Sequence, residues 1–139
     1  MNAKPRVVVG TVIVRAGRVL AARRTRPAEL AGYWEFPGGK TEDGEDPRDA
    51  LVREIAAELS ASIEVLDEVT GAGAPWPISE KYMLRLYLAS VVHGEPCPGA
   101  DHDLLRWLAA DELDALDWLA SDHLALPAVR SVLEASTPR

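Results

Sequence analysis

Residues 39–61 read GKTEDGEDPRDALVREIAAELSA, a turn-rich segment that leads directly into an amphipathic helix. Asp46 is a favourable N-cap residue, and Pro47 suits the first helical position. Asp49 follows in the first turn, where a negative charge complements the helix dipole. The apolar positions have near-helical spacing and are Ala50, Leu51, Ile55, Ala56 and Leu59. We therefore predict a helix over residues 47–59.

Two carboxylates of this helix point to metal chemistry. Glu54 and Glu58 are four residues apart, so they share one helix face. As exposed neighbours they repel each other by about 0.2–0.5 kcal/mol. A divalent cation bound between them makes the arrangement favourable instead. Carboxylate oxygens suit Mg²⁺ or Mn²⁺, and the glycines of residues 37–40 allow backbone carbonyls to approach the same ion. Glu45 and Arg53 are placed to form an ion pair between loop and helix.

Each part of this pattern also has a simpler interpretation. An acidic helix face that contains Arg is usually a solvated surface, and a Pro-Gly-Gly sequence is usually only a turn. The Glu54/Glu58 pair alone does not decide between the two interpretations.

The flanking segments predict strands on both sides of the helix. Residues 7–14 and 19–22 are rich in β-branched and aliphatic side chains around Ala16-Gly17, which predicts a hairpin. Residues 25–44 form a Pro- and Gly-rich loop of a length that is usually functional. Further elements are expected as strands at 63–66, 82–89 and 104–108, a loop at 93–103, a short helix at 111–116 and a last helix at 124–134. The order of elements predicts a mixed α/β (α+β) domain.

Composition and charge limit the classes of partner. The chain has 139 residues, 47% hydrophobic and 27% charged, which fits one globular domain over residues 1–139. The net charge of −7 argues against nucleic acid and anionic membranes as partners. The charge is uneven, because residues 1–41 carry eight Lys or Arg and two Glu, whereas residues 42–58 and 101–122 each carry seven acids.

Other features indicate a cytoplasmic protein. Cys97 is the only cysteine, so no disulfide can form within the chain. No apolar run approaches the roughly 20 residues that cross a bilayer, and no signal-peptide pattern opens the sequence. We expect a cytoplasmic monomer or homodimer with no membrane partner.

The joint spacing of the residues in and before the helix is far more specific than any single pair. Gly39, Glu45, Arg53, Glu54 and Glu58, together with Ile55, all match the pattern G-x5-E-x7-R-E-U-x-E-E-x-G-U, where U is a bulky aliphatic residue, and the sequence WEFPGGK over residues 34–40 precedes it. On these residues the chain resembles the Nudix hydrolase family, and within it the MutT and CTP pyrophosphohydrolase branch. The resemblance covers nearly the whole chain and implies the Nudix fold, a mixed β-sheet sandwiched between helices.

The chain departs from the family pattern at three positions. Ala57 stands where the pattern has the first Glu of its Glu-Glu pair, Ser60 stands for its Gly, and Ala61 for its aliphatic residue. One potential carboxylate ligand is therefore missing, although the pair Glu54/Glu58 remains. Ala57 is also the one feature that favours an alternative function, a nucleotide-sensing module without turnover.

The resemblance implies roles for particular residues. Glu54 and Glu58 would be metal ligands with the Gly38 carbonyl, and Glu54 would instead, or also, orient the attacking water. Arg53 and Glu45 would be the supporting ion pair. The remaining roles belong to Arg24, which would contact a substrate phosphate, and to Asp101, six residues before Trp107, as metal ligand or general base. The neighbouring His102 could assist, but a lone loop histidine is usually exposed.

Base recognition would fall to the segment before the last helix. Asp122 matches the position at which relatives read the base, and an ionised Asp accepts hydrogen bonds from an exocyclic amine such as cytosine N4. An N-cap role for the last helix is the rival interpretation of Asp122. Phe36 or Trp34 could stack on a base, and core packing is an equally good explanation for either ring.

The implied activity is hydrolysis of a nucleoside triphosphate to the monophosphate and pyrophosphate. Mg²⁺ is the expected cofactor, with Mn²⁺ as the alternative ion, and a small nucleotide is the expected partner. The favoured substrates are CTP, dCTP and 5-substituted dCTP, or 8-oxo-dGTP in the sanitisation of the nucleotide pool. Another nucleoside diphosphate derivative such as ADP-ribose is the alternative substrate.

Overall fold

The computed structural model describes residues 5–136. The predicted hairpin is confirmed and consists of β1 (Arg6–Arg15) and β2 (Arg18–Arg24). Ala16 and Gly17 both have positive φ, which matches the right-handed twist of the two strands in a two-residue turn. The hairpin carries Arg24 to the end of β2, as predicted.

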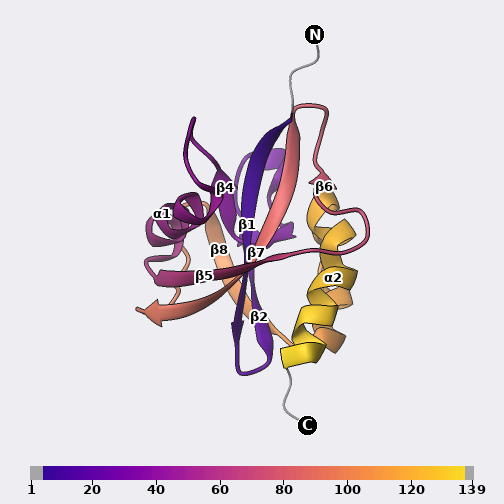
Figure 1. The fold of residues 1–139 in the computed structure, drawn as a ribbon. Helices are drawn as coiled ribbons and strands as arrows, with labels where there is room; N and C mark the ends of the chain where they lie inside the picture. The colour runs from indigo at the N-terminus through magenta and orange to yellow at the C-terminus, as the bar shows by residue number, and fades with distance from the viewer. Residues whose placement is uncertain (1–4, 137–139) are drawn as a thin grey trace.

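The hairpin is part of a mixed β-sheet (Figure 1). Hydrogen-bonded neighbours follow the order β3-β2-β1-β7-β5, while β4 pairs with β1, β6 with β7 and β8 with β2. The pairing of β1 with β7 is parallel and the others are antiparallel. The remaining strands are β3 (Trp34–Glu35), β4 (Gly38–Lys40), β5 (Ser62–Val69), β6 (Trp76–Pro77), β7 (Tyr82–His93) and β8 (His102–Leu108).

Helix α1 (Pro47–Leu59) begins and ends where the sequence predicts. Asp46 is its N-cap and accepts a hydrogen bond from the Arg48 backbone N–H. The helix covers one side of the sheet through Ala50, Leu51, Ile55 and Leu59, all fully buried. Ala56 was predicted on this apolar face but is exposed, because it lies about 100° around the helix from Ile55.

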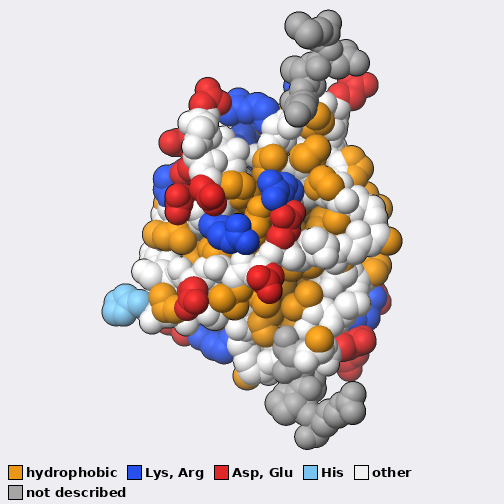
Figure 2. All heavy atoms as spheres, viewed as in Figure 1, with side chains coloured by type: hydrophobic (Ala, Val, Ile, Leu, Met, Phe, Trp, Pro, Cys, Tyr) orange, Lys and Arg blue, Asp and Glu red, His pale blue; other side chains and the backbone are white. Residues whose placement is uncertain are grey.

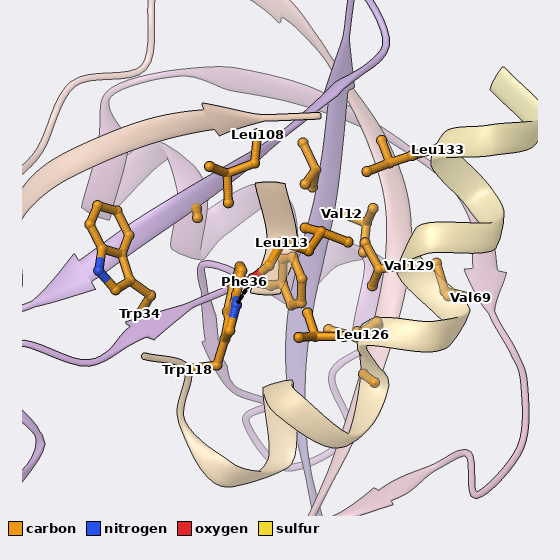
Figure 3. Packing of buried hydrophobic residues seen from close by; sticks show 14 of the residues in the cluster. Val12, Trp34, Phe36, Val69, Leu108, Leu113, Trp118, Leu126, Val129 and Leu133 are labelled. Atoms are coloured by element: carbon orange, nitrogen blue, oxygen red, sulfur yellow. Dashed lines mark hydrogen bonds between the residues drawn. The ribbon is translucent and has the colours of Figure 1, made fainter. Parts of the chain in front are cut away.

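Helix α2 (Ala120–Ser136) covers the other side, so the sheet lies between the two helices (Figure 1). Figure 3 shows side chains of α2 packed against Phe36 and Trp118, whose rings stack with centroids 4.6 Å apart. The Trp118 indole N–H donates to the Leu113 carbonyl at 2.6 Å. Two apolar clusters therefore hold the sheet, one under each helix.

Several predicted boundaries were wrong. The last helix begins at Ala120, four residues before the predicted start, and the predicted helix at 111–116 is a 3-10 helix, η2 (Ala110–Ala115). The loop at 93–103 is shorter than predicted, because pairing with β5 extends β7 to His93 and pairing with β2 starts β8 at His102. The Pro- and Gly-rich segment over residues 25–44 contains β3, β4 and a 3-10 turn, η1 (Ala28–Leu30).

The basic start of the chain is neutralised by acids from later segments. Arg6 pairs with Asp43, Arg23 with Asp103, and Arg18 with Glu112. Acidic and basic side chains accordingly lie side by side on the face in Figure 2. Among the described residues, no helix is long and apolar enough to cross a membrane.

Candidate active site

A cavity of about 560 Å³ opens where β2, β3, β4, α1 and α2 meet. It is lined by residues that are far apart in the sequence but that the fold brings together. The sequence-predicted residues on its wall are Arg24, Phe36, Gly38, Glu58, Asp101 and Asp122. Of the other predicted residues, Glu54, Arg53 and Glu45 are not among those that line the cavity, and they are described below.

The two glycines of β4 allow the backbone to lie close to its neighbours. A Cβ atom on Gly38 would overlap the Val9 carbonyl oxygen of β1. A Cβ atom on Gly39 would lie only 2.6 Å from the Glu54 carboxyl carbon. Only glycine fits at position 38, where a Cβ would meet backbone atoms, and at position 39 a Cβ would displace the Glu54 carboxyl group, so β4 packs directly against the acidic face of α1.

Glu58 is the most strongly perturbed acid of this face. Burial raises its pKa to about 8, and the negative charges of Glu35, Glu54 and Asp101 act in the same direction. Glu58 Oε2 is buried without a hydrogen-bond partner in the part of the chain that the structure describes. Loss of hydration and the nearby negative charges both make an ionised carboxylate costly here, and a bound cation would offset that cost.

The predicted ion pair between loop and helix is present. Arg53 donates from Nε and Nη2 to both carboxylate oxygens of Glu45, at 3.0 and 2.8 Å. This bidentate contact with Arg53 is the main reason why the pKa of Glu45 is lowered to about 2. Arg53 Nη1 also donates to Glu54 at 2.7 Å, so one guanidinium fixes the loop and a predicted metal ligand together.

Arg24 and Asp101 both line the cavity, and each already has hydrogen-bond partners within the protein. Arg24 Nη1 donates to both oxygens of Glu35, at 3.1 and 3.0 Å, and its Nε and Nη2 donate to the Arg26 carbonyl. Asp101 lies in the turn before β8 and accepts a hydrogen bond from Arg26 Nε at 2.6 Å. The structure thus brings a predicted phosphate contact and a predicted metal ligand to the same rim.

Sequence reasoning missed Glu35 and misjudged His102. Glu35, on β3, lies between Arg24 and His102, whose Nε2 is 2.8 Å from Glu35 Oε2. His102 was expected to be an exposed loop residue, but it begins β8 and is only 2% exposed. The acid between two large aromatic residues, Trp34 and Phe36, was the available signal, because alternation in a strand places it on the opposite side from both rings.

Asp122 lies elsewhere than predicted. It is in the first turn of α2 and not before the helix, so it is not the N-cap. Its Oδ2 accepts the Phe36 backbone N–H at 2.9 Å, and its Oδ1 is 3.3 Å from Ser121 Oγ. Burial, aided by the charge of Glu35, raises the pKa of Asp122 to about 7.

The aromatic residues offered for base stacking belong to the core. Phe36 and Trp34 are 2% and 6% exposed. One face of Phe36 is covered by Trp118, although Phe36 still borders the cavity. Packing therefore explains both rings, and stacking on a base stays a prediction for Phe36.

The carboxylates of Glu54, Glu58 and Asp101, called the acidic wall below, fit a hard divalent cation. The buried Oε2 of Glu58, which has no hydrogen-bond partner among the described residues, and the neighbouring carboxylates supply the oxygen donors that Mg²⁺ and Mn²⁺ prefer. Within residues 5–136, no three His, Cys, Asp or Glu side chains already form a group that could hold a metal ion. Glu54 and Asp101 are instead paired with arginines, so the Gly38 carbonyl, water or phosphate oxygens would complete the coordination.

The mixed sheet between two helices and the spacing from Gly39 to Glu58 define the Nudix class of hydrolases. Residues 4–128 match the model of the NUDIX domain. The chain therefore belongs to the Nudix family, and it is a pyrophosphohydrolase of the MutT-like branch.

Named relatives and solved structures agree with this assignment. The chain is 39% identical to the 8-oxo-dGTP diphosphatase of Escherichia coli over 83% of this chain and 88% of the relative. It is 35% identical to the E. coli CTP pyrophosphohydrolase over 76% of each chain. A Mycobacterium tuberculosis protein provisionally named 8-oxo-dGTP diphosphatase 2 is 44% identical over 84% of this chain and 82% of its own length.

Among solved structures, the solution structure of the E. coli ORF135 protein superposes with a TM-score of 0.78 at 30% identity, covering 98% of this chain and 96% of that one. The MutT NUDIX hydrolase from Burkholderia pseudomallei gives a TM-score of 0.71 at 35% identity, with coverage of 91% and 99%. The expected family and fold are confirmed.

Proposed function

We propose that this chain is a metal-dependent nucleoside triphosphate pyrophosphohydrolase that converts NTP and water to NMP and pyrophosphate. The observation that carries the proposal is the cavity in which a buried oxygen of Glu58, without a hydrogen-bond partner in residues 5–136, lies near other carboxylates and Arg24. A carboxylate cluster suits a cation, and a guanidinium suits a phosphate. A polyphosphate that arrives with a divalent cation satisfies both.

The acidic wall would hold the cation. Glu54, Glu58 and Asp101, with the Gly38 carbonyl, are the proposed ligands, and Mg²⁺ is the favoured ion ahead of Mn²⁺. A bound divalent cation would neutralise charge that develops on the phosphate oxygens. Arg53 and Glu45 would hold the Glu54 carboxylate in place, and Glu54 or Asp101 would orient or deprotonate the attacking water.

Arg24 would contact a substrate phosphate at the rim that it shares with Asp101. Its four hydrogen bonds to Glu35 and Arg26 leave at least one of the five guanidinium N–H groups for a ligand. The same contacts hold the side chain in one orientation, so little conformational entropy is lost when the phosphate binds.

Ala57 is the departure that bears most on turnover. It is exposed on α1, so solvent reaches the position where the family pattern has a carboxylate. We propose that Glu54 and Glu58 suffice for at least one cation, and that the missing carboxylate weakens the binding of any further ion.

Asp122 would read the base. It borders the cavity with a carboxylate that the Phe36 N–H and Ser121 already fix in one orientation. In its ionised form it accepts from an exocyclic amine, which favours CTP, dCTP and 5-substituted dCTP. Because guanine also presents N–H donors, 8-oxo-dGTP is the second substrate, and the names of the relatives support both.

The domain organisation, location, oligomeric state and partners of the chain are proposals as well. We propose that residues 1–139 form one domain, that the protein acts in the cytoplasm as a monomer or homodimer, and that small nucleotides are its partners.

A panel of nucleotides with pyrophosphate detection tests the function. Purified protein with Mg²⁺ is offered CTP, dCTP, 8-oxo-dGTP, dGTP and ADP-ribose. We expect pyrophosphate and the monophosphate from the triphosphates. Stoichiometric binding without pyrophosphate release would support the sensing module instead, and AMP release from ADP-ribose alone would support the other Nudix activity.

The base contact has its own test. The ratios of kcat/KM for dCTP, 8-oxo-dGTP and dGTP are compared between the wild type and Asp122→Asn, which keeps an acceptor for Phe36 but adds a donor. We expect the preference for dCTP to fall. Unchanged ratios would contradict the proposed contact.

A further inference from the structure

The carboxylate of Glu35 is held between two donors at the rim of the cavity. Arg24 Nη1 donates to both of its oxygens, and His102 Nε2 lies 2.8 Å from Oε2. A carboxylate has only acceptors, so Nε2 carries the hydrogen and donates. The three side chains form a chain of contacts from a buried strand to the cavity.

An irregularity in the sheet places His102 in this position. In the pairing of β8 with β2, Leu104 lies opposite Arg23. The next residue of β2, Arg24, lies opposite His102, so Asp103 is skipped. Asp103 is therefore the extra residue of a β-bulge, a feature that re-aims side chains beside active sites. The displaced Asp103 forms a bidentate ion pair with Arg23, at 2.9 and 3.0 Å.

The surroundings of His102 indicate a role beyond filling space. Its side chain is fully buried, and Nδ1 has no hydrogen-bond partner within the described range of the chain. An apolar residue of the same size would avoid this unsatisfied nitrogen. Within the part of the chain that the structure describes, the hydrogen bond that the imidazole does make goes to Glu35.

A second donor stabilises Glu35 because acids as well as Arg24 lie near its carboxylate. Its charge acts on both Glu58 and Asp122 across the cavity. Without a second donor, repulsion from these acids in their ionised forms would favour rotation of the Glu35 carboxylate out of its contact with Arg24. The guanidinium would then be restrained only through the Arg26 carbonyl.

We propose that His102 is a positioning residue that fixes the Glu35 carboxylate, and through it the Arg24 guanidinium, in the orientation that receives the substrate phosphate. This inference rests on the proposed function. His102 acts through Glu35 and touches neither the substrate nor the reacting atoms.

Three substitutions separate positioning from packing. His102→Gln places an amide donor near the position of Nε2, whereas His102→Asn places it near Nδ1 and His102→Leu has no donor. We expect KM for CTP to rise about ten-fold in the Leu and Asn variants, the effect of losing one hydrogen bond to a charged group. We expect His102→Gln to stay within about two-fold of the wild type, and kcat to change little in all three.

A second set of variants tests the route through Arg24. In an Arg24→Ala background, His102→Leu should raise KM no further, because the group that it positions is absent. The matched control is His93→Leu, which removes an exposed histidine at the end of β7 and should leave KM unchanged. Melting temperatures identify any variant that fails to fold. The KM values of the Gln and Asn variants then compare two polar side chains that differ in where they place the donor.

Equal increases of KM in the Gln, Asn and Leu variants would overturn the proposal, as would an undiminished effect in the Arg24→Ala background. Activity of the wild type is measured first, because pyrophosphate release tests the proposed function separately. If the wild type binds CTP without turnover, the proposed function fails. The positioning role would still be supported if the Kd for CTP rises in the Leu and Asn variants but not in the Gln variant. A Kd that His102→Leu leaves unchanged would overturn it.

Discussion

The Asp122 carboxylate joins two distant parts of the chain, because it accepts the Phe36 backbone N–H from the first turn of α2. It is 4% exposed, and burial is the main cause that raises its pKa to about 7 from the ordinary value of 3.8. The side chain therefore keeps its proton in the folded state at pH values where it has lost it in the unfolded state. Such a group makes stability depend on pH.

Asp122→Asn should reduce that dependence. Because the folded pKa is raised, the unfolding free energy of the wild type should fall as pH rises from 5 to 8.5, by about 3 kcal/mol from this group. The Asn variant has no such proton, so it should lose less stability than the wild type over the same range. Urea unfolding at pH 5 and pH 8.5 measures the difference, with the exposed Asp111→Asn as control. Parallel curves for wild type and Asp122→Asn would contradict the raised pKa.

At the residue scale, the sequence predicted the acids of α1 but not their neighbours. The spacing of Glu54 and Glu58 is local, so the helix period alone places them together. Glu35 and His102 meet across three strands and a β-bulge, and no local spacing reports that register. Sequence reasoning therefore found the acidic wall and missed the carboxylate that holds Arg24.

Elements defined by their own sequence were predicted correctly, whereas elements that depend on pairing with distant strands were missed. α1 has an N-cap, a proline at its first position and a periodic apolar face, and its predicted range is correct. The strands β3 and β4 contain two and three residues, too few for alternation to be recognised. They exist because β2 and β1 provide partners. The start of α2 was missed because the turn that contains Asp122 reads as a polar connection.

The C-terminus of α1 permits a test of the Ser60 substitution in the family pattern. Ser60 is the C-cap with φ 57° and ψ 34°, the left-handed region that glycine adopts at little cost. Ser60→Gly should stabilise the protein by about 1 kcal/mol, which corresponds to a rise in Tm of about 3 °C. The control Ser62→Gly, in the extended strand β5, should lower stability by about 0.5–1 kcal/mol. A lower Tm for Ser60→Gly would contradict this account of the helix end.

At the scale of the whole molecule, ion pairs between distant segments distribute the charge. Arginines of the basic N-terminal segment pair with acids of both later blocks, as Arg6 does with Asp43 and Arg26 with Asp101. The net charge of −7 therefore says little about the cavity, where a guanidinium and several carboxylates lie together. The proposed ligand carries both a cation and an anion, so it complements both.

Metal addition should stabilise the folded chain. A cation that binds the folded state alone raises Tm, and Mg²⁺ at saturating concentration should raise it by about 5 °C, reversibly with EDTA. The increase should shrink in Glu58→Gln, which removes a proposed ligand, and persist in Glu64→Gln, which alters an exposed acid of β5. Thermal unfolding with and without Mg²⁺ gives both results. An equal increase in Glu58→Gln would place the cation elsewhere.

The most direct test of the central claim is the rate of pyrophosphate release from CTP and 8-oxo-dGTP with Mg²⁺, in the wild type, Glu54→Gln and Glu58→Gln. Each substitution keeps the size of the side chain and removes a carboxylate of the acidic wall. The account predicts release by the wild type and a loss of at least about 100-fold in kcat/KM in each variant. Turnover that survives both substitutions would show that the catalytic site lies elsewhere.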